Sequence, residues 1–167
     1  MGLIIRQLYL DAGFEPGVFD VVFADTADCE LIIGNPMIRG VTMTGSCGAG
    51  KAVAALAGKY MKKCTFELGG SDPFVVLNDA DITLAAEKGA FGRLMNSGQA
   101  CINAKRFIVQ KDVYDQFKEK LVEVVSANYK LGENIGPLAR RDLLDNLKNQ
   151  VKIAIEGGAK VFHGPVE

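Results

Sequence analysis

The chain has 167 residues, of which 49% are hydrophobic and 23% are charged, and its formal net charge is −1. This composition is typical of a globular domain, and the absence of any Lys/Arg run argues against a nucleic-acid partner. No stretch approaches the ~18 apolar residues of a membrane span, and residues 1–6 (MGLIIR) lack the features of a secretory signal. We therefore expect a cytoplasmic protein that does not enter a membrane.

Helical and strand-like spacing of apolar residues alternate along the first part of the chain. Leu3, Ile4 and Leu8 recur at the spacing of one helix face, and Gly13 is a suitable stop. Residues 18–23 are β-branched and aromatic, which favours a strand. The predicted elements are helix 2–14, strand 18–23, helix 26–33, strand 41–43, helix 51–61 and strand 64–68.

The same alternation continues to the end of the chain. Asp81 or Thr83 can cap a helix that continues to about residue 95. The predicted elements are strand 73–77, this helix, strand 107–109, helices 113–129 and 140–156, and strand 159–163. The inner face of helix 113–129 is predicted to carry Tyr114, Phe117, Leu121, Val124 and Val125. This βαβα order predicts an α/β fold around a mainly parallel sheet, with a domain junction at residues 67–70.

Residues 44–51 (TGSCGAGK) form a glycine-rich turn between a predicted strand and a predicted helix. Such a turn presents backbone N–H groups and a helix N-terminus to a phosphate. Gly45 and Ser46 are therefore candidates for contact with a pyrophosphate. A glycine turn that serves only close helix packing is the alternative.

Two better-known phosphate motifs fit this turn poorly. Gly45, Gly50 and Lys51 match the P-loop pattern, but Ala52 stands where a Ser or Thr hydroxyl would bind Mg²⁺. The dinucleotide fingerprint G-x-G-x-x-G also fails, because Val53 occupies the position of its third glycine. A P-loop-like nucleotide-binding protein is thus a remote alternative.

The chain has four cysteines without a C-x-x-C pair and one histidine, which argues against a metal site and favours free thiols. Cys101 is distinguished by its polar surroundings, since it follows residues 96–100 (NSGQA) and precedes Lys105 and Arg106. A nearby cation or helix N-terminus raises the thiolate fraction, so Cys101 is the candidate nucleophile. A buried structural cysteine is the alternative, and Cys29 and Cys64 are interpreted in that way. Lys105 and Arg106 are interpreted as a solvated pair.

Glu67 lies at the end of a predicted strand, and one residue separates it from Gly69 and Gly70. The glycines leave room for a substrate or cofactor to approach the backbone, and a carboxylate there can accept a proton from water. Glu67 is therefore the candidate base, and a surface carboxylate is the alternative. His163 would be the usual base in a Cys–His pair, but no third residue of such a site is recognisable. Arg93 is interpreted as an exposed helix arginine.

Taken in order, these elements resemble the motifs of the aldehyde dehydrogenase superfamily. Residues 43–46 (MTGS) are similar to the family's F-T-G-S turn, residues 67–70 (ELGG) to its E-L-G-G motif, and residues 98–101 (GQAC) to its G-Q-x-C motif. The spacing between the glutamate and the cysteine is also similar, and residues 135–138 (IGPL) look like a further family landmark. The finer sequence looks most like the bacterial succinate-semialdehyde dehydrogenase branch.

The resemblance implies an aldehyde dehydrogenase-like α/β fold, truncated at both ends. Residues 1–66 would be the latter part of a Rossmann-type NAD(P)-binding domain, and residues 67–167 the first part of the catalytic domain. It implies NAD or NADP as the cofactor and a small aldehyde, such as succinate semialdehyde, as the substrate. The residues that it places along the cofactor are Gly45, Ser46, Leu68 and Gly69.

The resemblance also implies that Cys101 attacks the aldehyde carbonyl and that Glu67 activates the water that releases the carboxylic acid. The Cys101 backbone N–H would hold the oxyanion. Chains of this family are far longer, and their P-W-N segment, E-x-F-G-P segment and dimerisation segment have no counterpart here. The resemblance implies that full-length relatives form homo-oligomers. Because these segments have no counterpart here, the alternative to an active enzyme is an inactive or partner-dependent fragment of one.

Overall fold

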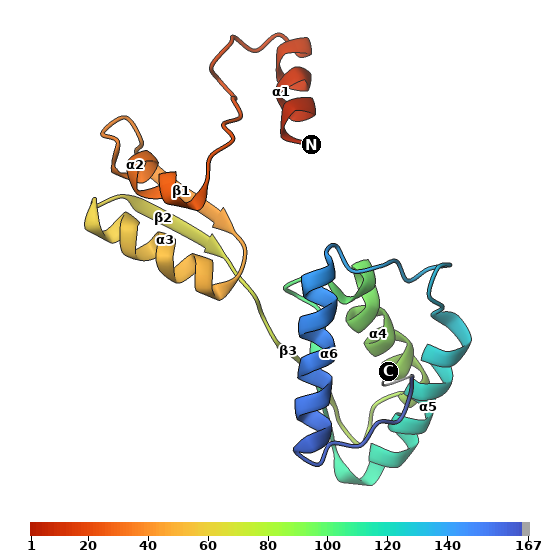
Figure 1. The fold of residues 1–167 in the computed structure, drawn as a ribbon. Coiled ribbons are helices and arrows are strands. Elements are labelled where there is room, and N and C mark those ends of the chain that lie inside the picture. Colours follow the sequence, from red (N-terminus) through yellow and green to blue (C-terminus); the bar gives the residue numbers. More distant parts are fainter. Residues whose placement is uncertain (165–167) are drawn as a thin grey trace. The chain divides into compact units, whose positions relative to one another are not determined.

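The computed structural model describes residues 1–164, and the chain forms two compact units, Met1–Leu68 and Gly69–Glu167. Each unit contains one two-stranded parallel sheet, together with helices that precede, connect or follow its strands (Figure 1). The predicted α/β class and the parallel pairing are confirmed, but the strands form two separate sheets rather than one. Within the described residues, no helix is both long and apolar enough to cross a membrane.

In the first unit, strands β1 (Gly40–Thr44) and β2 (Lys63–Glu67) pair from Gly40 opposite Lys63 to Thr44 opposite Glu67. Parallel strands need a crossover, and α3 (Cys47–Lys59) supplies it and lies along the pair (Figure 1). Both strands therefore end at the same edge of the sheet. The elements before β1 are α1 (Gly2–Asp11), a short 3₁₀ turn (Thr26–Asp28) and α2 (Cys29–Gly34).

The predicted strand over residues 18–23 is wrong, because this segment is irregular. Val22 and Phe23 are 77% and 81% exposed, so their side chains pack against little of the described chain. The Asp20 carboxylate accepts hydrogen bonds from Arg6 Nε (2.8 Å) and from the backbone N–H of Val21 (2.9 Å). β-branched composition favours a strand only where a partner strand is present to pair with it.

The second unit follows the predicted order of helices and strands as far as α6. Its elements are β3 (Asp72–Val76), α4 (Ile82–Leu94), a 3₁₀ turn (Met95–Gly98), β4 (Ala104–Val109), a 3₁₀ turn (Lys111–Val113), α5 (Tyr114–Asn128) and α6 (Arg141–Glu156). Asp81 rather than Thr83 caps α4, since its Oδ1 accepts from the Leu84 N–H at 3.0 Å. The predicted strand over residues 159–163 is wrong, because these residues are irregular and pair with no strand of the described chain.

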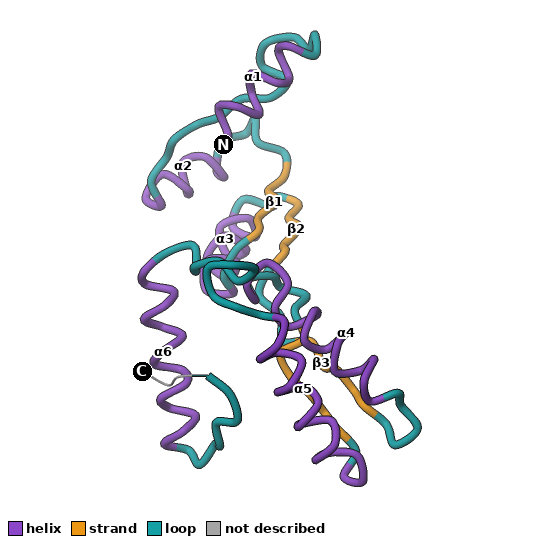
Figure 2. The backbone as a smooth tube through the Cα atoms, turned by 90° about the vertical axis from the view of Figure 1, so that its right-hand side faces the viewer, coloured by secondary structure: helices purple, strands orange, loops and turns teal. Residues whose placement is uncertain are grey.

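The core of the second unit lies where α4 and α5 pack beside the β3–β4 pair (Figure 2). The rings of Phe74, Phe107 and Phe117 form a cluster with centroids 5.4–6.5 Å apart. Gly89 of α4 lets Phe107 approach, because a Cβ at this position would lie 2.8 Å from its ring. Tyr114, predicted to face inward, is 44% exposed. The buried members of the core are Val76, Ala86, Ala90, Phe117 and Val124.

We predict that Phe117→Ala destabilises the second unit by about 3–5 kcal/mol, because it removes a ring that is 2% exposed and leaves a cavity between two other rings. Phe91→Ala is the matched control, since Phe91 is 58% exposed on α4 and should cost less than ~1 kcal/mol. Urea unfolding followed by circular dichroism measures both. Equal losses in the two variants would contradict this assignment of the core.

Candidate active site

The turn after β1 is a capped helix N-terminus. The Ser46 hydroxyl oxygen accepts a hydrogen bond from the Ala49 N–H (3.2 Å), and the Ser46 carbonyl accepts from the Gly50 N–H (2.9 Å). The N–H groups of Cys47 and Gly48, in the first turn, have no acceptor within the helix. No acidic residue lies in this turn, so the free N–H groups and the helix dipole favour an anion.

The predicted glycine loop is therefore shorter than expected, because α3 begins at Cys47 rather than at Lys51. The cap provided by Ser46 allows Gly48 and Gly50 to form the first helical turn. In a P-loop these residues would form a loop around the phosphates before the helix begins. Together with Ala52, the helical geometry argues against nucleotide hydrolysis at this turn.

The end of β2 is attached to this turn. The Gly45 N–H donates to the Glu67 carbonyl oxygen at 3.0 Å, and Leu68 packs against α3 at Gly50. A Cβ at Gly50 would lie 2.7 Å from both terminal methyl groups of Leu68, so the close approach requires a glycine. The structure thus brings the predicted residues Gly45, Ser46, Glu67 and Leu68 together at one sheet edge. The Glu67 side chain is exposed, and within residues 1–164 its carboxylate makes no hydrogen bond or ion pair.

The loop before Cys101 has an unusual backbone. Asn96 and Ser97 have φ values of 52° and 57°, and Gly98 continues this left-handed run with φ 76°. Left-handed residues other than glycine cost about 1–3 kcal/mol each and persist only where the surrounding structure holds them. Arg93 contributes to this hold, since its guanidinium donates to the Gly98 carbonyl at 3.3 Å. The interpretation of Arg93 as an exposed helix arginine is therefore wrong.

Asn103 is the buried polar residue of this loop and was not identified from the sequence. Its side chain is fully buried, at 0% exposed. Its Oδ1 accepts from the Ala100 N–H (2.6 Å), and its Nδ2 donates to the carbonyls of Gly92 (3.0 Å) and Met95 (3.3 Å). The amide thereby joins the last turn of α4 to the loop that carries Cys101. No sequence pattern distinguishes this asparagine from an exposed one.

Lys105 is half-buried rather than solvated as predicted from the sequence, whereas Arg106 is exposed. The Lys105 ammonium donates to three backbone carbonyls, those of Gly70 (2.7 Å), Ala100 (3.1 Å) and Cys101 (3.0 Å). Arg106 Nε donates to the carbonyl of Ser71 at 2.9 Å. A Cβ at Gly70 would lie 2.8 Å from the Cys101 carbonyl oxygen, so the second glycine of the ELGG motif makes room for the cysteine loop.

The segment before α6 also contacts the cysteine loop. The Gly136 N–H donates to the Ser97 hydroxyl at 2.9 Å, and the Ala139 N–H donates to Gln99 Oε1 at 2.8 Å. Both acceptors belong to the run NSGQ that precedes Cys101. The IGPL landmark over residues 135–138 is thereby held against this run.

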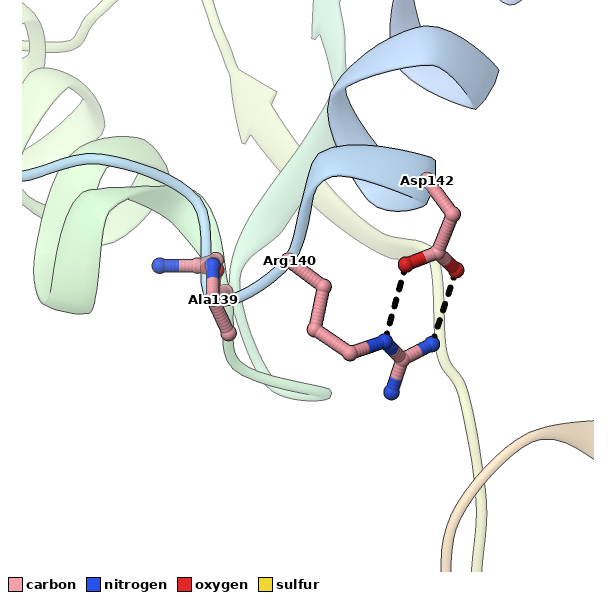
Figure 3. A network of polar contacts seen from close by, with 4 residues as sticks. Ala139, Arg140 and Asp142 are labelled. Carbon is pink, nitrogen blue, oxygen red and sulfur yellow. Dashed lines mark hydrogen bonds and ion pairs between the residues drawn. The ribbon is translucent and has the colours of Figure 1, made fainter.

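Directly after Ala139, Arg140 and Asp142 form a bidentate ion pair with both contacts at 2.9 Å (Figure 3). The hydrogen bond from Arg140 lowers the pKa of the Asp142 carboxyl below its usual value. The pair spans the start of α6, because Arg140 precedes the helix and Asp142 lies in its first turn.

The four cysteines differ in exposure, and the histidine contacts a serine. Cys101, Cys47 and Cys64 are exposed and Cys29 is half-buried, so the interpretation of Cys64 as a buried structural cysteine is wrong. His163 contacts the Ser126 hydroxyl at 3.1 Å through Nδ1 and is not paired with a cysteine. Among the described residues, no group of three or more His, Cys, Asp or Glu side chains is placed to hold a metal.

Glu67 belongs to the first unit and Cys101 to the second. The assignment of the units as cofactor and catalytic domains remains a prediction.

Comparison with protein families identifies the chain. The model of the aldehyde dehydrogenase family matches residues 1–166. The chain belongs to the aldehyde dehydrogenase family. The matched residues include the motifs MTGS, ELGG and GQAC, so the family resemblance of these motifs is confirmed.

Curated relatives and solved structures give a finer comparison. The NADP(+) succinate-semialdehyde dehydrogenase of Deinococcus radiodurans is 44% identical over 168 positions, covering 97% of this chain and 35% of that protein. The NAD(P)+ succinate semialdehyde dehydrogenase Sad of Escherichia coli K12 is also 44% identical, over 96% of this chain and 36% of its own length. The solved succinic semialdehyde dehydrogenase of Streptococcus pyogenes in complex with NADP+ is 36% identical with a TM-score of 0.89, covering 98% of this chain and 37% of that one. The chain therefore spans about a third of these relatives.

We predict that Asn103→Ala destabilises the second unit by about 1–3 kcal/mol, because it leaves one N–H and two carbonyl groups without their partner. Amide hydrogen exchange at Ala100 should become faster at the same time. Asn149→Ala on the exposed side of α6 is the control and should change stability by less than ~0.5 kcal/mol. Unchanged exchange at Ala100 would contradict the role given to the Asn103 amide.

We predict that the Asp142 carboxyl titrates below its usual value of 3.8, because the hydrogen bond from Arg140 favours its charged form. A lowered pKa means that the ion pair stabilises the fold above pH 3.8 and loses this effect as the pH falls through the lowered value. NMR titration of Asp142 in Arg140→Gln should return the midpoint toward 3.8. Arg141→Gln, which affects the neighbouring pair with Asp145, should leave it unchanged.

Proposed function

We propose that this chain forms the part of an NAD(P)-dependent aldehyde dehydrogenase that carries its nucleophile and its general base. The observation that carries the proposal is Cys101, an exposed thiol at the end of a left-handed loop fixed by buried hydrogen bonds. Strain held in place in this way is typical of functional loops. The names of the relatives support succinate semialdehyde, or a similar small aldehyde, as the substrate.

In this mechanism the Cys101 thiolate attacks the carbonyl carbon of the aldehyde. A C–S bond forms, and the electron pair of the C=O bond moves to oxygen, giving a thiohemiacetal. The Cys101 backbone N–H is available to this oxygen, because it has no hydrogen-bond acceptor within the described chain. A preorganised donor of this kind stabilises the developing oxyanion.

Loss of a hydride from the thiohemiacetal carbon to a bound NAD or NADP would leave a thioester on Cys101, and Glu67 serves its hydrolysis. Its exposed carboxylate has no hydrogen-bond or ion-pair partner among the described residues, so it can accept a proton from water as that water attacks the thioester. The C–S bond breaks, the carboxylic acid leaves, and the Cys101 thiolate is regenerated. We place this chemistry in a reducing compartment such as the cytoplasm, because the thiol is exposed and must remain free.

The N-terminus of α3 fits the pyrophosphate of NAD or NADP. Ser46 and Gly45 border two free N–H groups with no acidic residue beside them, and Leu68 and Gly69 follow at the same end of β2. When bound, the nicotinamide ring supplies the hydride acceptor of the oxidation. This assignment agrees with the NADP(+) and NAD(P)+ in the names of the relatives.

A second candidate is an inactive or partner-dependent fragment of such an enzyme. Val75 of β3 and Ile108 of β4 are register partners and are 58% and 51% exposed, so one face of this parallel pair is open and apolar. Parallel sheets are normally covered on both faces. The chain also spans only 35% of the Deinococcus relative.

We predict that the chain forms NAD(P)H from succinate semialdehyde and that Cys101→Ser reduces the rate by at least ~10³-fold, because the nucleophile is lost. Cys64→Ser is the matched control, since Cys64 is exposed on β2 and should not affect turnover. Absorbance of the reduced cofactor measures all three proteins.

The alternatives give different results in the same assay. Turnover that survives in Cys101→Ser would contradict the nucleophile. No turnover by any of the three proteins, together with no thermal shift on addition of NADP⁺, would favour the hypothesis of an inactive or partner-dependent fragment. Concentration-dependent association in sedimentation would then identify partner dependence.

A further inference from the structure

Lys105 contacts the peptide unit that carries the Cys101 N–H. One of its three acceptors is the Ala100 carbonyl, at 3.1 Å from Nζ. The Ala100–Cys101 peptide is trans and planar, so its N–H points opposite to its carbonyl. A contact that fixes the Ala100 carbonyl therefore also fixes the direction of the Cys101 N–H.

The neighbouring contacts hold this peptide from both sides. The Ala100 carbonyl also accepts from the Asn103 N–H at 3.3 Å, and the Ala100 N–H donates to the buried Asn103 side chain. Lys105 in addition holds the Cys101 carbonyl, which belongs to the next peptide unit. With both flanking carbonyls bound, rotation of the Cys101 N–H away from its direction would break at least one charge-assisted hydrogen bond.

The charge of Lys105 also acts on the donor itself. A cation on an amide carbonyl polarises the amide, and hydrogen bonds in such a chain strengthen one another. The Cys101 N–H has no acceptor of its own in residues 1–164, so the polarised donor is left for a ligand atom.

We infer that Lys105 is a positioning residue that holds the Cys101 backbone N–H toward the oxyanion formed when Cys101 attacks a carbonyl. The inference rests on the proposed function, in which Cys101 is the nucleophile. In the attack, a bond forms from Sγ to the carbonyl carbon, and the π electron pair moves to the oxygen that the N–H then binds. Lys105 gives up no proton and touches no reacting atom, because its three acceptors are backbone carbonyls.

Two reagents separate the oxyanion from the thiolate in the full 167-residue chain. p-Nitrophenyl acetate acetylates the thiolate through a tetrahedral oxyanion and releases p-nitrophenolate. Iodoacetamide alkylates the same thiolate by direct displacement of iodide, without an oxyanion. Neither reaction needs a cofactor, and peptide mass spectrometry reports each cysteine separately, with exposed Cys64 as the internal reference.

We predict that Lys105→Met lowers acetylation of Cys101 by about tenfold or more, since loss of a whole oxyanion donor costs ~10²–10³-fold. Alkylation of Cys101 should change by less than about threefold, because displacement develops no oxyanion for the N–H to stabilise. Lys105→Arg should restore part of the acetylation, as it keeps a cationic donor. Lys88→Met is the control, since Lys88 is exposed on α4 and should change neither rate.

The other outcomes overturn the inference. An equal fall in both reactions of Cys101 in Lys105→Met would mean that Lys105 acts on the thiolate or on folding, and unchanged acetylation would mean that it positions nothing. If Lys105→Met does not fold, failure of Lys105→Arg to acetylate Cys101 faster than it acetylates Cys64 overturns the inference in the same way. Loss of the proposed function is a separate result, seen as NAD(P)H formation that survives in Cys101→Ser.

Discussion

The register of each parallel strand pair is the constraint on which the candidate residues of its unit depend. In the first unit, Thr44 lies opposite Glu67, so the turn at Gly45 and the end of β2 meet at one edge. In the second unit, Asp72 lies opposite Ala104, so the segments before the two strands run side by side and Gly70 approaches Cys101. Motifs far apart in the sequence are brought together because parallel strands start and end at common edges.

Most of the elements could be predicted from the sequence, because their apolar spacing agrees with the packing that forms. The helix over Tyr114–Asn128 buries Phe117 and Val124 as its pattern indicates. Prediction failed where an element depends on a neighbour, as in residues 18–23, which have β-forming side chains but no strand to pair with. It also failed at Cys47, because the start of α3 depends on the hydrogen bond that the Ser46 side chain accepts from the Ala49 N–H rather than on periodicity.

In the candidate site, residues with reactive side chains were easier to predict than the residues that hold the loop in place. Cys101 and Glu67 could be proposed from the sequence because their side-chain chemistry and their neighbouring glycines suggest reaction roles. The contacts of Asn103 and Lys105 could not be predicted, since their side chains bind backbone groups that only the folded loop brings within reach. Supporting polar residues of this kind act through geometry, which composition and spacing do not encode.

The ELGG motif illustrates how closely the two kinds of role are joined. The Glu67 carboxylate is exposed, while its backbone carbonyl accepts a hydrogen bond from the Gly45 N–H. Leu68 needs the absence of a side chain at Gly50, and the Cys101 carbonyl needs the absence of one at Gly70. The motif crosses the boundary between the two units after Leu68, so its first half is held by the turn after β1 and its last glycine lies against the cysteine loop. A substitution at either glycine would therefore disturb the packing of the candidate site, although neither glycine carries a reactive group.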